Sequence, residues 1–340
     1  MKKTNLLLSI TLIFVFMGFY SNCLGNDKEI VVMTWGGNWG DSFKKTIAEP
    51  FEKKFGIKVV VELQTTVRAA IPKLQAQKEN PQIDVWTSSM GGVEAAGELG
   101  LLVPINEEMI PNIKEIYDHG KGPYSVGWYT TPRGILYRSD LAGFEIREWK
   151  DLWDARLKNK MAAPDISFAG GQFLVISALV GGGNERNIEP GFEMAKKLKP
   201  NIAMFFSSDS EAIKLLQAGE AAVTAMSLLP NVYPLLGKDA RYKFPVPTTP
   251  LLGSTDQITI TNPKKKELAA KLVNYMLSVE VQEALCFELG AVPINKKGKA
   301  PKEVAYIIPN LQKMYKTDYD YINKNLAAWT DRWNREIKIR

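Results

Sequence analysis

Short apolar runs alternate with helical segments along most of the chain, and this order limits the possible folds more than any other feature. Strands are predicted at 29–35, 56–63 and 83–89, and helices at 41–55, 67–81 and 91–102. The first helix has apolar residues every four positions from Phe43 to Phe55, and Asp41 is its expected N-cap. Strands joined by helices of this length pair in parallel, so the first series predicts a parallel sheet covered by helices.

A second series of the same kind begins after Tyr137. Its strands are predicted at 159–167, 201–208 and 221–227, and its helices at 170–182 and 208–220. An extended stretch at 254–263 leads to helices at 265–290, and a last helix carries an apolar stripe from Ile322 to Trp333. The two series predict an α/β fold with two lobes, a mostly parallel sheet flanked by helices in each, and a ligand cleft between them. We assign 26–135 plus 255–298 to lobe 1, and 136–254 plus 299–340 to lobe 2.

The N-terminus has the order of segments that is typical of a secretory signal peptide, which we place at residues 1–25. Two lysines precede an apolar run at 5–20, and the small-residue stretch "SNCLG" follows it. The run is too short and too close to the N-terminus to favour a permanent membrane anchor. We therefore predict an exported protein, periplasmic or at the cell surface. Lipidation of Cys23 is the alternative, although the residues before it fit a lipidation motif poorly.

Several function classes leave no trace in the sequence. There is no G-x-S-x-G elbow, no phosphate-binding loop and no G-x-G-x-x-G fingerprint. His119, the only histidine, is expected to face solvent, and Cys286 is expected to be a buried thiol on an apolar helix face. Because histidines and cysteines do not cluster, we predict no metal site and no cofactor. The net charge of +6 is spread thinly along the chain, so we predict no nucleic-acid partner.

Candidate binding residues lie in loops that follow predicted strands, because ligands of open parallel sheets sit beyond the carboxyl ends of the strands. At "SSMGG" and "SFAGGQ", hydroxyl residues and glycines lead into helices, whose free N–H groups and dipole attract polar oxygens. The simpler alternative is that these serines only cap their helices. The candidates from these loops, and from the loop after the last strand of lobe 2, are Ser88, Ser89, Met90, Ser167 and Ser227.

Two further candidates come from the first loop and from the crossing between the lobes. Trp35 ends the first predicted strand within "WGGNWGD", and we expect it to form a wall of the site with Asn38 and Trp39 as neighbours. Flat aromatic rings can stack on a ligand or hold a cation over their face. Arg133 lies where the chain crosses between the lobes. It can pair with an acidic ligand or with a neighbouring carboxylate, and both interpretations stay open.

The order of several motifs resembles a known family. "PFEKKFGIKV", "IDVWTSS", "KLLQAGEAAV" and "GAVPIN" follow one another as in the substrate-binding proteins of bacterial ABC importers, in the branch with the spermidine/putrescine, ferric-iron and thiamine binders. The resemblance implies the type II periplasmic-binding-protein fold, two hinge crossings, lobe closure around a ligand and delivery to a membrane permease. It implies a carrier, not an enzyme, and we expect a monomer.

The resemblance also bears on the solute. Trp35 falls on the aromatic residue that polyamine binders use, and Asp165 lies near their acidic pair, whose second member is missing here. Ser227 replaces a tryptophan, and Thr255 replaces a hinge aspartate, with Asp256 one position along. We therefore predict a small polar organic solute that is polyamine-like, amino-acid-like or a small anion. The alternatives are a secreted hydrolase or lyase that uses cleft carboxylates, and a ferric-iron carrier.

Overall fold

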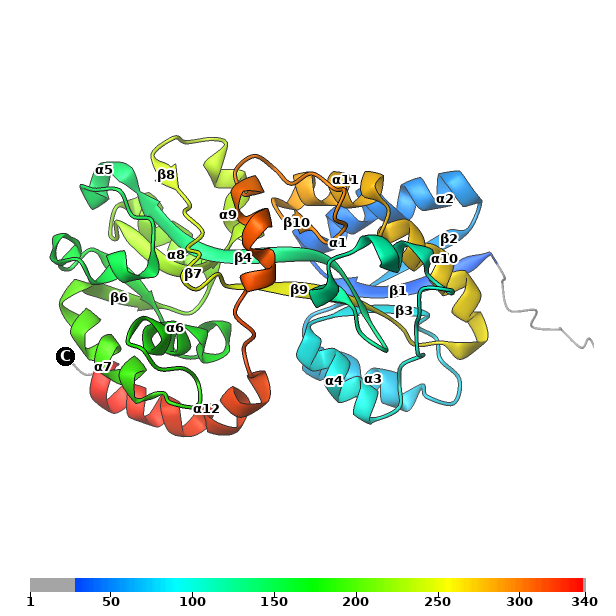
Figure 1. Cartoon of the computed structure of the whole chain (residues 1–340), viewed down its shortest axis with the longest axis horizontal. Coiled ribbons are helices and arrows are strands. Elements are labelled where there is room, and N and C mark those ends of the chain that lie inside the picture. Colours follow the sequence, from blue (N-terminus) through cyan, green and yellow to red (C-terminus); the bar gives the residue numbers. More distant parts are fainter. Residues whose placement is uncertain (1–27, 339–340) are drawn as a thin grey trace, which may run out of the picture.

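The protein is seen in a computed structural model that describes residues 28–338, apart from the side chains of Arg68 and Gln312. The predicted signal peptide and Cys23 lie outside the described residues. Two lobes sit side by side and share one sheet of ten strands (Figure 1). Its main path runs in the order β2-β1-β3-β9-β4-β7-β5-β6, with β8 and β10 paired to β4. None of the helices in this part of the chain is long and apolar enough to cross a membrane.

Lobe 1 is built on three parallel strands, as the alternation of elements predicts. β1 (Glu29–Trp35) lies between β2 (Lys58–Gln64) and β3 (Val85–Ser88), and β9 (Gly253–Ile260) adds an antiparallel strand. One face of this sheet is covered by the helices α1, α2, α10 and α11, and the other by α3 (Val67–Ala76) and α4 (Met90–Glu98). Each face has its own buried apolar core.

The first predicted helix of lobe 1 differs from the one observed. It begins earlier than expected, because Gly37 adopts a positive φ of 62° and turns the chain directly into α1 (Asn38–Phe43). Asp41 is therefore a first-turn residue and not the N-cap. A π-helical turn at Lys44–Ala48 then leads into α2 (Glu49–Phe55). The helices predicted at 265–290 are α10 (Lys266–Met276) and α11 (Val279–Leu289).

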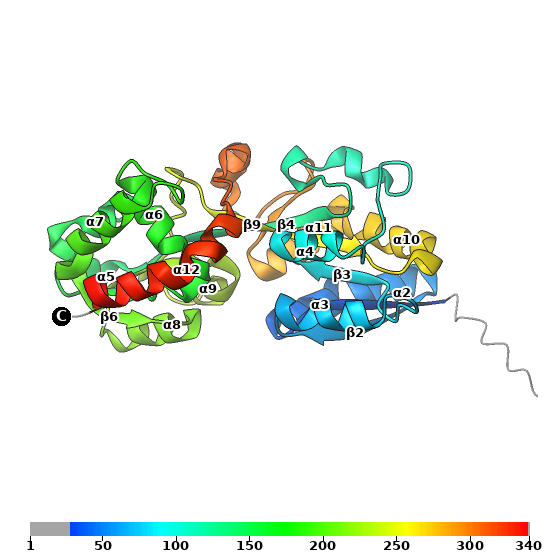
Figure 2. The same cartoon turned by 90° about the horizontal axis from the view of Figure 1, so that it is seen from below.

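Lobe 2 repeats the arrangement with β5 (Met161–Pro164) between β6 (Ile202–Phe206) and β7 (Val223–Leu228), all parallel. Its helices are α6 (Gln172–Val180), α7 (Glu189–Leu198), α8 (Asp209–Ala218), α9 (Leu229–Leu236) and α12 (Tyr319–Trp333). Figure 2 shows α12 lying along the lower face of this lobe. Ile322, Trp329 and Trp333 are buried in its core, which confirms the packing predicted for the C-terminal stripe.

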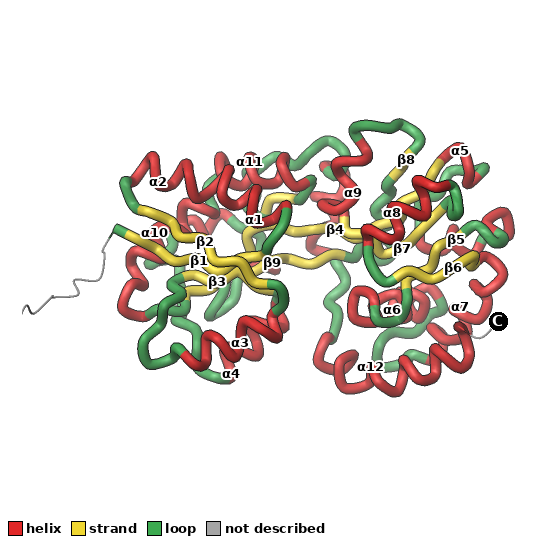
Figure 3. The backbone as a smooth tube through the Cα atoms, turned by 180° about the vertical axis from the view of Figure 1, so that it is seen from behind, coloured by secondary structure: helices red, strands yellow, loops and turns green. Residues whose placement is uncertain are grey.

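The two lobes are joined by long strands. β4 (Val126–Arg138) pairs with β9 through its first half and with β7 through its second half, so it belongs to both lobes. Figure 3 shows β4 and β9 running between the lobes. The predicted lobe boundaries at 135/136 and 254/255 fall inside these two strands. The chain passes between the lobes once more after β10 (Val292–Pro293), in addition to the two expected crossings.

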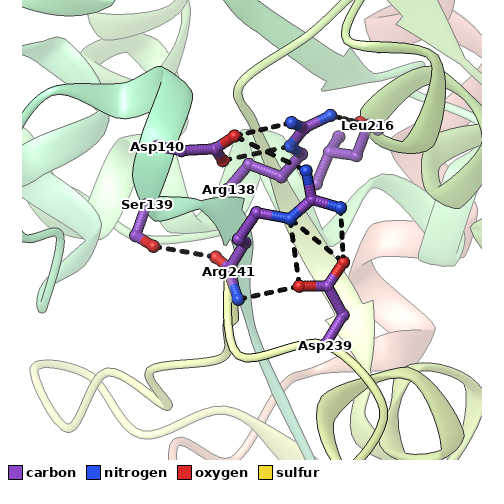
Figure 4. A network of polar contacts seen from close by, with 6 residues as sticks. All are labelled: Arg138, Ser139, Asp140, Leu216, Asp239 and Arg241. Atoms are coloured by element: carbon purple, nitrogen blue, oxygen red, sulfur yellow. Dashed lines mark hydrogen bonds and ion pairs between the residues drawn. The ribbon is translucent and has the colours of Figure 1, made fainter.

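An ionic network fixes the far end of β4 in lobe 2 (Figure 4). Arg138 ends the strand, forms a two-point ion pair with Asp140 of α5 (Ser139–Ala142), and donates from Nη1 to the carbonyl oxygen of Leu216 at 3.2 Å. Arg241, next to β8 (Tyr242–Lys243), pairs with Asp239 at 2.7 Å. These contacts anchor the strand that links the lobes.

Candidate functional site

Three side chains meet where β1 ends beside the β4–β9 ladder. The indole Nε1 of Trp35 donates to Oδ2 of Asp256 at 2.8 Å, and the hydroxyl of Tyr129 donates to the same oxygen at 3.1 Å. Burial raises the pKa of Asp256 to about 7, although hydrogen bonding from Trp35, Tyr129 and Trp128 acts in the opposite direction. A carboxylate has about four acceptor positions, so Asp256 can accept a further proton donor from a ligand.

Aromatic rings surround this carboxyl group. Trp39 stacks on Tyr129 with ring centroids 5.6 Å apart and planes 18° apart, and Trp128 lies 4.5 Å from the same ring. Asn38, at the start of α1, is exposed beside them. A carboxylate next to aromatic faces is an environment that suits an ammonium group, because the ring quadrupole and the negative charge both attract a cation.

The hydroxyl loop of lobe 1 is arranged differently from a simple helix cap. Ser88 is buried at the end of β3, and its Oγ has no hydrogen-bond partner within residues 28–338. A Cβ added at Gly92 would lie 2.1 Å from this Oγ, so only glycine fits there. Ser89 is the N-cap residue of α4, yet its side chain makes no cap hydrogen bond, and Met90 is exposed beside it. These serines therefore do not act as side-chain caps.

Arg133 lies at the lobe 2 end of the crossing and is half-buried. Its Nη1 donates to the carbonyl oxygen of Met226 at 2.9 Å. Met226 has a φ of 64°, a left-handed conformation that is uncommon for a residue with a side chain. No carboxylate of the described residues lies within ion-pairing distance of Arg133. The interpretation that Arg133 simply pairs with a neighbouring carboxylate thus finds no direct ion pair in the structure.

Polar groups from four helices surround Arg133. Burial raises the pKa of Asp209, and Asn231 donates to its Oδ2 at 2.7 Å. Gln172 donates from Nε2 to the hydroxyl of Tyr319 at 2.6 Å. Burial lowers the pKa of Arg133, and the nearby Asp209 and Tyr319 oppose this shift. The buried Oγ of Ser227 faces Asp209 and lowers the pKa of that carboxyl group, although the two groups are not in full hydrogen-bond geometry.

Two predicted candidates of lobe 2 bind each other. The amide and hydroxyl of Ser167 donate to Oδ1 of Asp165 at 3.1 and 2.9 Å, and Lys338 forms an ion pair with Oδ2. Burial opposes ionisation of Asp165, but Lys338 and Ser167 lower its pKa overall. In the hinge, Thr255 shares a hydrogen bond of 2.9 Å with Thr130 across the ladder. These three residues are thus occupied by partners from the protein itself.

The structure gathers the candidates into two groups. Trp35, Trp39 and Asp256 form the lobe 1 group, with Tyr129 added; Arg133 and Ser227 form the lobe 2 group, with Gln172, Asp209 and Tyr319 added. No local pattern in the sequence identifies the added residues, because they come from strands and helices far apart in the chain. A surface pocket of about 340 Å³, lined by Leu74, Gln77 and Thr261 among others, lies away from both groups, at the amino end of β3.

The single histidine belongs to neither of the two groups. His119 is half-buried, not solvent-facing as predicted, and stacks on Tyr117 with centroids 5.8 Å apart. Neither ring nitrogen has a hydrogen-bond partner in the described part of the chain. Burial lowers its pKa below the usual 6.5, so the ring is neutral at pH 7. Cys286 is a buried free thiol, which confirms the prediction for it.

A buried carboxylate fastens the segment that carries Tyr319. Glu185 is 5% exposed, accepts from the hydroxyl of Tyr315, and accepts from the backbone amide of Asp318 at 2.9 Å. Glu185 lies in the loop after α6, within the glycine-rich stretch at 181–188. The loop thus holds the start of α12 against lobe 2, and Tyr319 with it.

Replacing Glu185 with alanine is expected to loosen this segment. It leaves the Tyr315 hydroxyl and the Asp318 amide without their charged acceptor, which we expect to cost about 2 kcal/mol. Hydrogen exchange at the amides of 315–321 should become faster, whereas Glu193→Ala, which removes only an exposed pair with Lys196, should leave it unchanged. Equal protection in the two variants would show that the contacts of Glu185 do not hold this segment in place.

Comparisons with known proteins come from sequence and from structure. Residues 46–308 match the family described as bacterial extracellular solute-binding protein. Spermidine/putrescine-binding periplasmic protein 1 of Haemophilus influenzae is 28% identical over 287 residues, 78% of this chain and 77% of the relative. An ABC transporter structure from Clostridium perfringens is 28% identical with a TM-score of 0.75, covering 91% of this chain and 99% of that one.

A third comparison bears on the fold alone. A spermidine/putrescine ABC transporter substrate-binding protein from Streptococcus pneumoniae is 20% identical, with a TM-score of 0.77 over 90% of this chain and 99% of that chain. The two-lobed arrangement predicted from the sequence is therefore confirmed in solved structures of similar shape.

Proposed function

The chain belongs to the bacterial extracellular solute-binding protein family, and from this premise we propose that it captures a small polar organic solute with an amino group between its lobes. It is the substrate-binding component of an ABC importer and hands the solute to a membrane permease. The predicted signal peptide supports export across the cytoplasmic membrane, to the side where such a solute is first met.

One observation carries the choice of an amino group. The carboxyl group of Asp256 lies among the rings of Trp35, Trp39 and Tyr129, and this arrangement offers a cation a charge partner and aromatic faces together. The site lies on β9, one of the strands that link the lobes, so a bound solute can couple directly to lobe closure. Residues 28–338 contain no group of three or more histidine, cysteine, aspartate and glutamate side chains that could hold a metal ion.

A thermal-shift screen tests the proposal. A solute that binds only the folded state raises the melting temperature, so polyamines, amino acids, phosphonates, sugars and ferric ion should be compared. We expect the shift with amines and not with sugars or ferric ion. A shift with no solute class, together with turnover of a substrate, would support the hydrolase or lyase alternative instead.

Replacing Trp35 with alanine should reduce the binding free energy of the amine by about 1–3 kcal/mol, because both a stacking face and a hydrogen bond to Asp256 are lost. The amine to use is the one that gives the largest thermal shift. Isothermal titration measures the loss. Trp35→Phe keeps a ring but not the N–H donor, so its affinity should lie between those of the native protein and Trp35→Ala. Phe287→Ala, at an exposed residue of α11, is the control and should bind as tightly as the native protein. Unchanged affinity in Trp35→Ala would remove this residue from the site.

A further inference from the structure

The β4–β9 ladder presents a row of polar side chains on one of its faces. Tyr129 lies opposite Asp256 and Thr131 opposite Ser254 in the antiparallel register, and the two hydroxyls of the second pair are 2.9 Å apart. Arg133 is the next residue of β4 with the same orientation, because side chains alternate between faces with a period of two. The Thr130–Thr255 pair lies on the opposite face. One face therefore runs from Asp256, past two hydroxyls, to Arg133.

This row holds the carboxyl group of Asp256 and the guanidinium of Arg133 at opposite ends of a fixed length of strand. Tyr129 and Arg133 are four residues apart, which corresponds to about 13 Å along β4 at the usual rise per residue. The ionisable groups that act on Arg133 are Asp209 and Tyr319, and Asp256 is not among them. Arg133 and Asp256 thus do not neutralise each other, and each keeps binding capacity at its own end of the row.

The Arg133 end is equipped for an acidic group. Only Nη1 of the guanidinium has a partner among the described residues, the carbonyl of Met226, so other N–H donors stay available. Ser227 lies on β7 opposite Gly134, next to Arg133, and its buried Oγ also faces the carboxyl group of Asp209, whose pKa is raised by burial. The hydroxyl of Tyr319 is close by. A planar guanidinium with neighbouring hydroxyls suits a carboxylate or phosphonate.

We propose that the solute is a zwitterion whose ammonium group and acidic group are separated by a carbon chain, with the ammonium at Asp256 and the acid at Arg133. This rests on the proposed function and narrows its solute class. A diamine would place its second ammonium against a guanidinium, where like charges repel. An α-amino acid carries its two charges too close together to reach both ends of the row.

Isothermal titration of the exported chain with five probes tests the proposal: glycine, γ-aminobutyrate, ε-aminocaproate, putrescine and butyrate. We expect one of the two longer amino acids to bind most tightly, and glycine, putrescine and butyrate to bind at least about tenfold more weakly. Arg133→Gln should weaken the longer amino acid by about 30-fold or more and leave putrescine unchanged or tighter. Arg133→Lys keeps the charge but loses the planar, two-point donor arrangement of the guanidinium, so its affinity for the longer amino acid should lie between those of the native protein and Arg133→Gln.

The ranking of probes by the native protein does not depend on any variant, so a poorly folding Arg133→Gln protein leaves the test intact. Putrescine binding more tightly than both longer amino acids would overturn the zwitterion and leave the proposed function standing. An Arg133→Gln protein that binds putrescine and the longer amino acids with equally reduced affinity would also overturn the zwitterion and leave the proposed function standing. Binding of none of the probes by a cooperatively melting protein would overturn both the zwitterion and the amine-binding function.

Discussion

Replacing Gln282 with alanine is expected to lower the free energy of unfolding by about 4 kcal/mol or more, because it strips partners from four buried backbone groups at once. Gln282 is fully buried in α11. Its Nε2 donates to the carbonyls of Trp128 and Met276, and its Oε1 accepts from the amides of Ile294 and Asn295 at 2.8 and 3.1 Å. One side chain thus ties the helices to the linking strand β4 and to the strand segment at β10.

Urea unfolding followed by tryptophan fluorescence measures this loss, since Trp128 itself lies at the junction. Gln75→Ala is the matched control, because it makes the same substitution at an exposed position of α3 and should change stability by less than about 0.5 kcal/mol. If Gln282→Ala unfolds at the same urea concentration as Gln75→Ala, the junction does not depend on these four hydrogen bonds.

The two lobes could be predicted because their signals are local. A parallel strand needs a crossover element before the next one, so the alternation in the sequence already specifies two covered sheets. Helix ends were less certain where a single residue decides them. Gly37 starts α1 ahead of the expected Asp41.

The site could be predicted only in part, because its contacts join distant parts of the chain. Trp35 was identifiable as an aromatic residue at a strand end, but its partner Asp256 lies 221 positions away. Tyr319 reaches Gln172 from 147 positions away, on a helix whose visible pattern is an apolar stripe. Asp165 and Ser167 had the right loop and the right residue types, yet Lys338 from the C-terminal end occupies the carboxylate. No local pattern reports such pairing.

Binding of an amine is expected to weaken about tenfold for each pH unit below pH 7, because the pKa of Asp256 is raised to about 7 and an ammonium group favours its ionised form. Between pH 8 and pH 5 the affinity for putrescine or γ-aminobutyrate should therefore fall by about 100-fold. The ammonium group of the solute stays charged throughout this range, so the carboxyl group of the protein determines the slope. Asp256→Asn should bind weakly with little dependence on pH, like the native protein at low pH.

The titration of Asp256 should have the opposite effect on the stability of the ligand-free protein. Its pKa is higher in the folded than in the unfolded chain, so the folded state binds more protons between about pH 4 and pH 7, and stability falls as the pH rises through that window. Above pH 7 the loss of stability is complete, and Asp256→Asn should lack this part of the pH dependence.

Melting curves of both proteins from pH 4.5 to pH 8, with and without γ-aminobutyrate, measure the two effects together. Because rising pH destabilises the empty site and strengthens binding of the amine, the stabilisation by the ligand should grow with pH in the native protein alone. Parallel curves for the two proteins would mean that Asp256 titrates as an ordinary exposed carboxyl group and does not receive the amine.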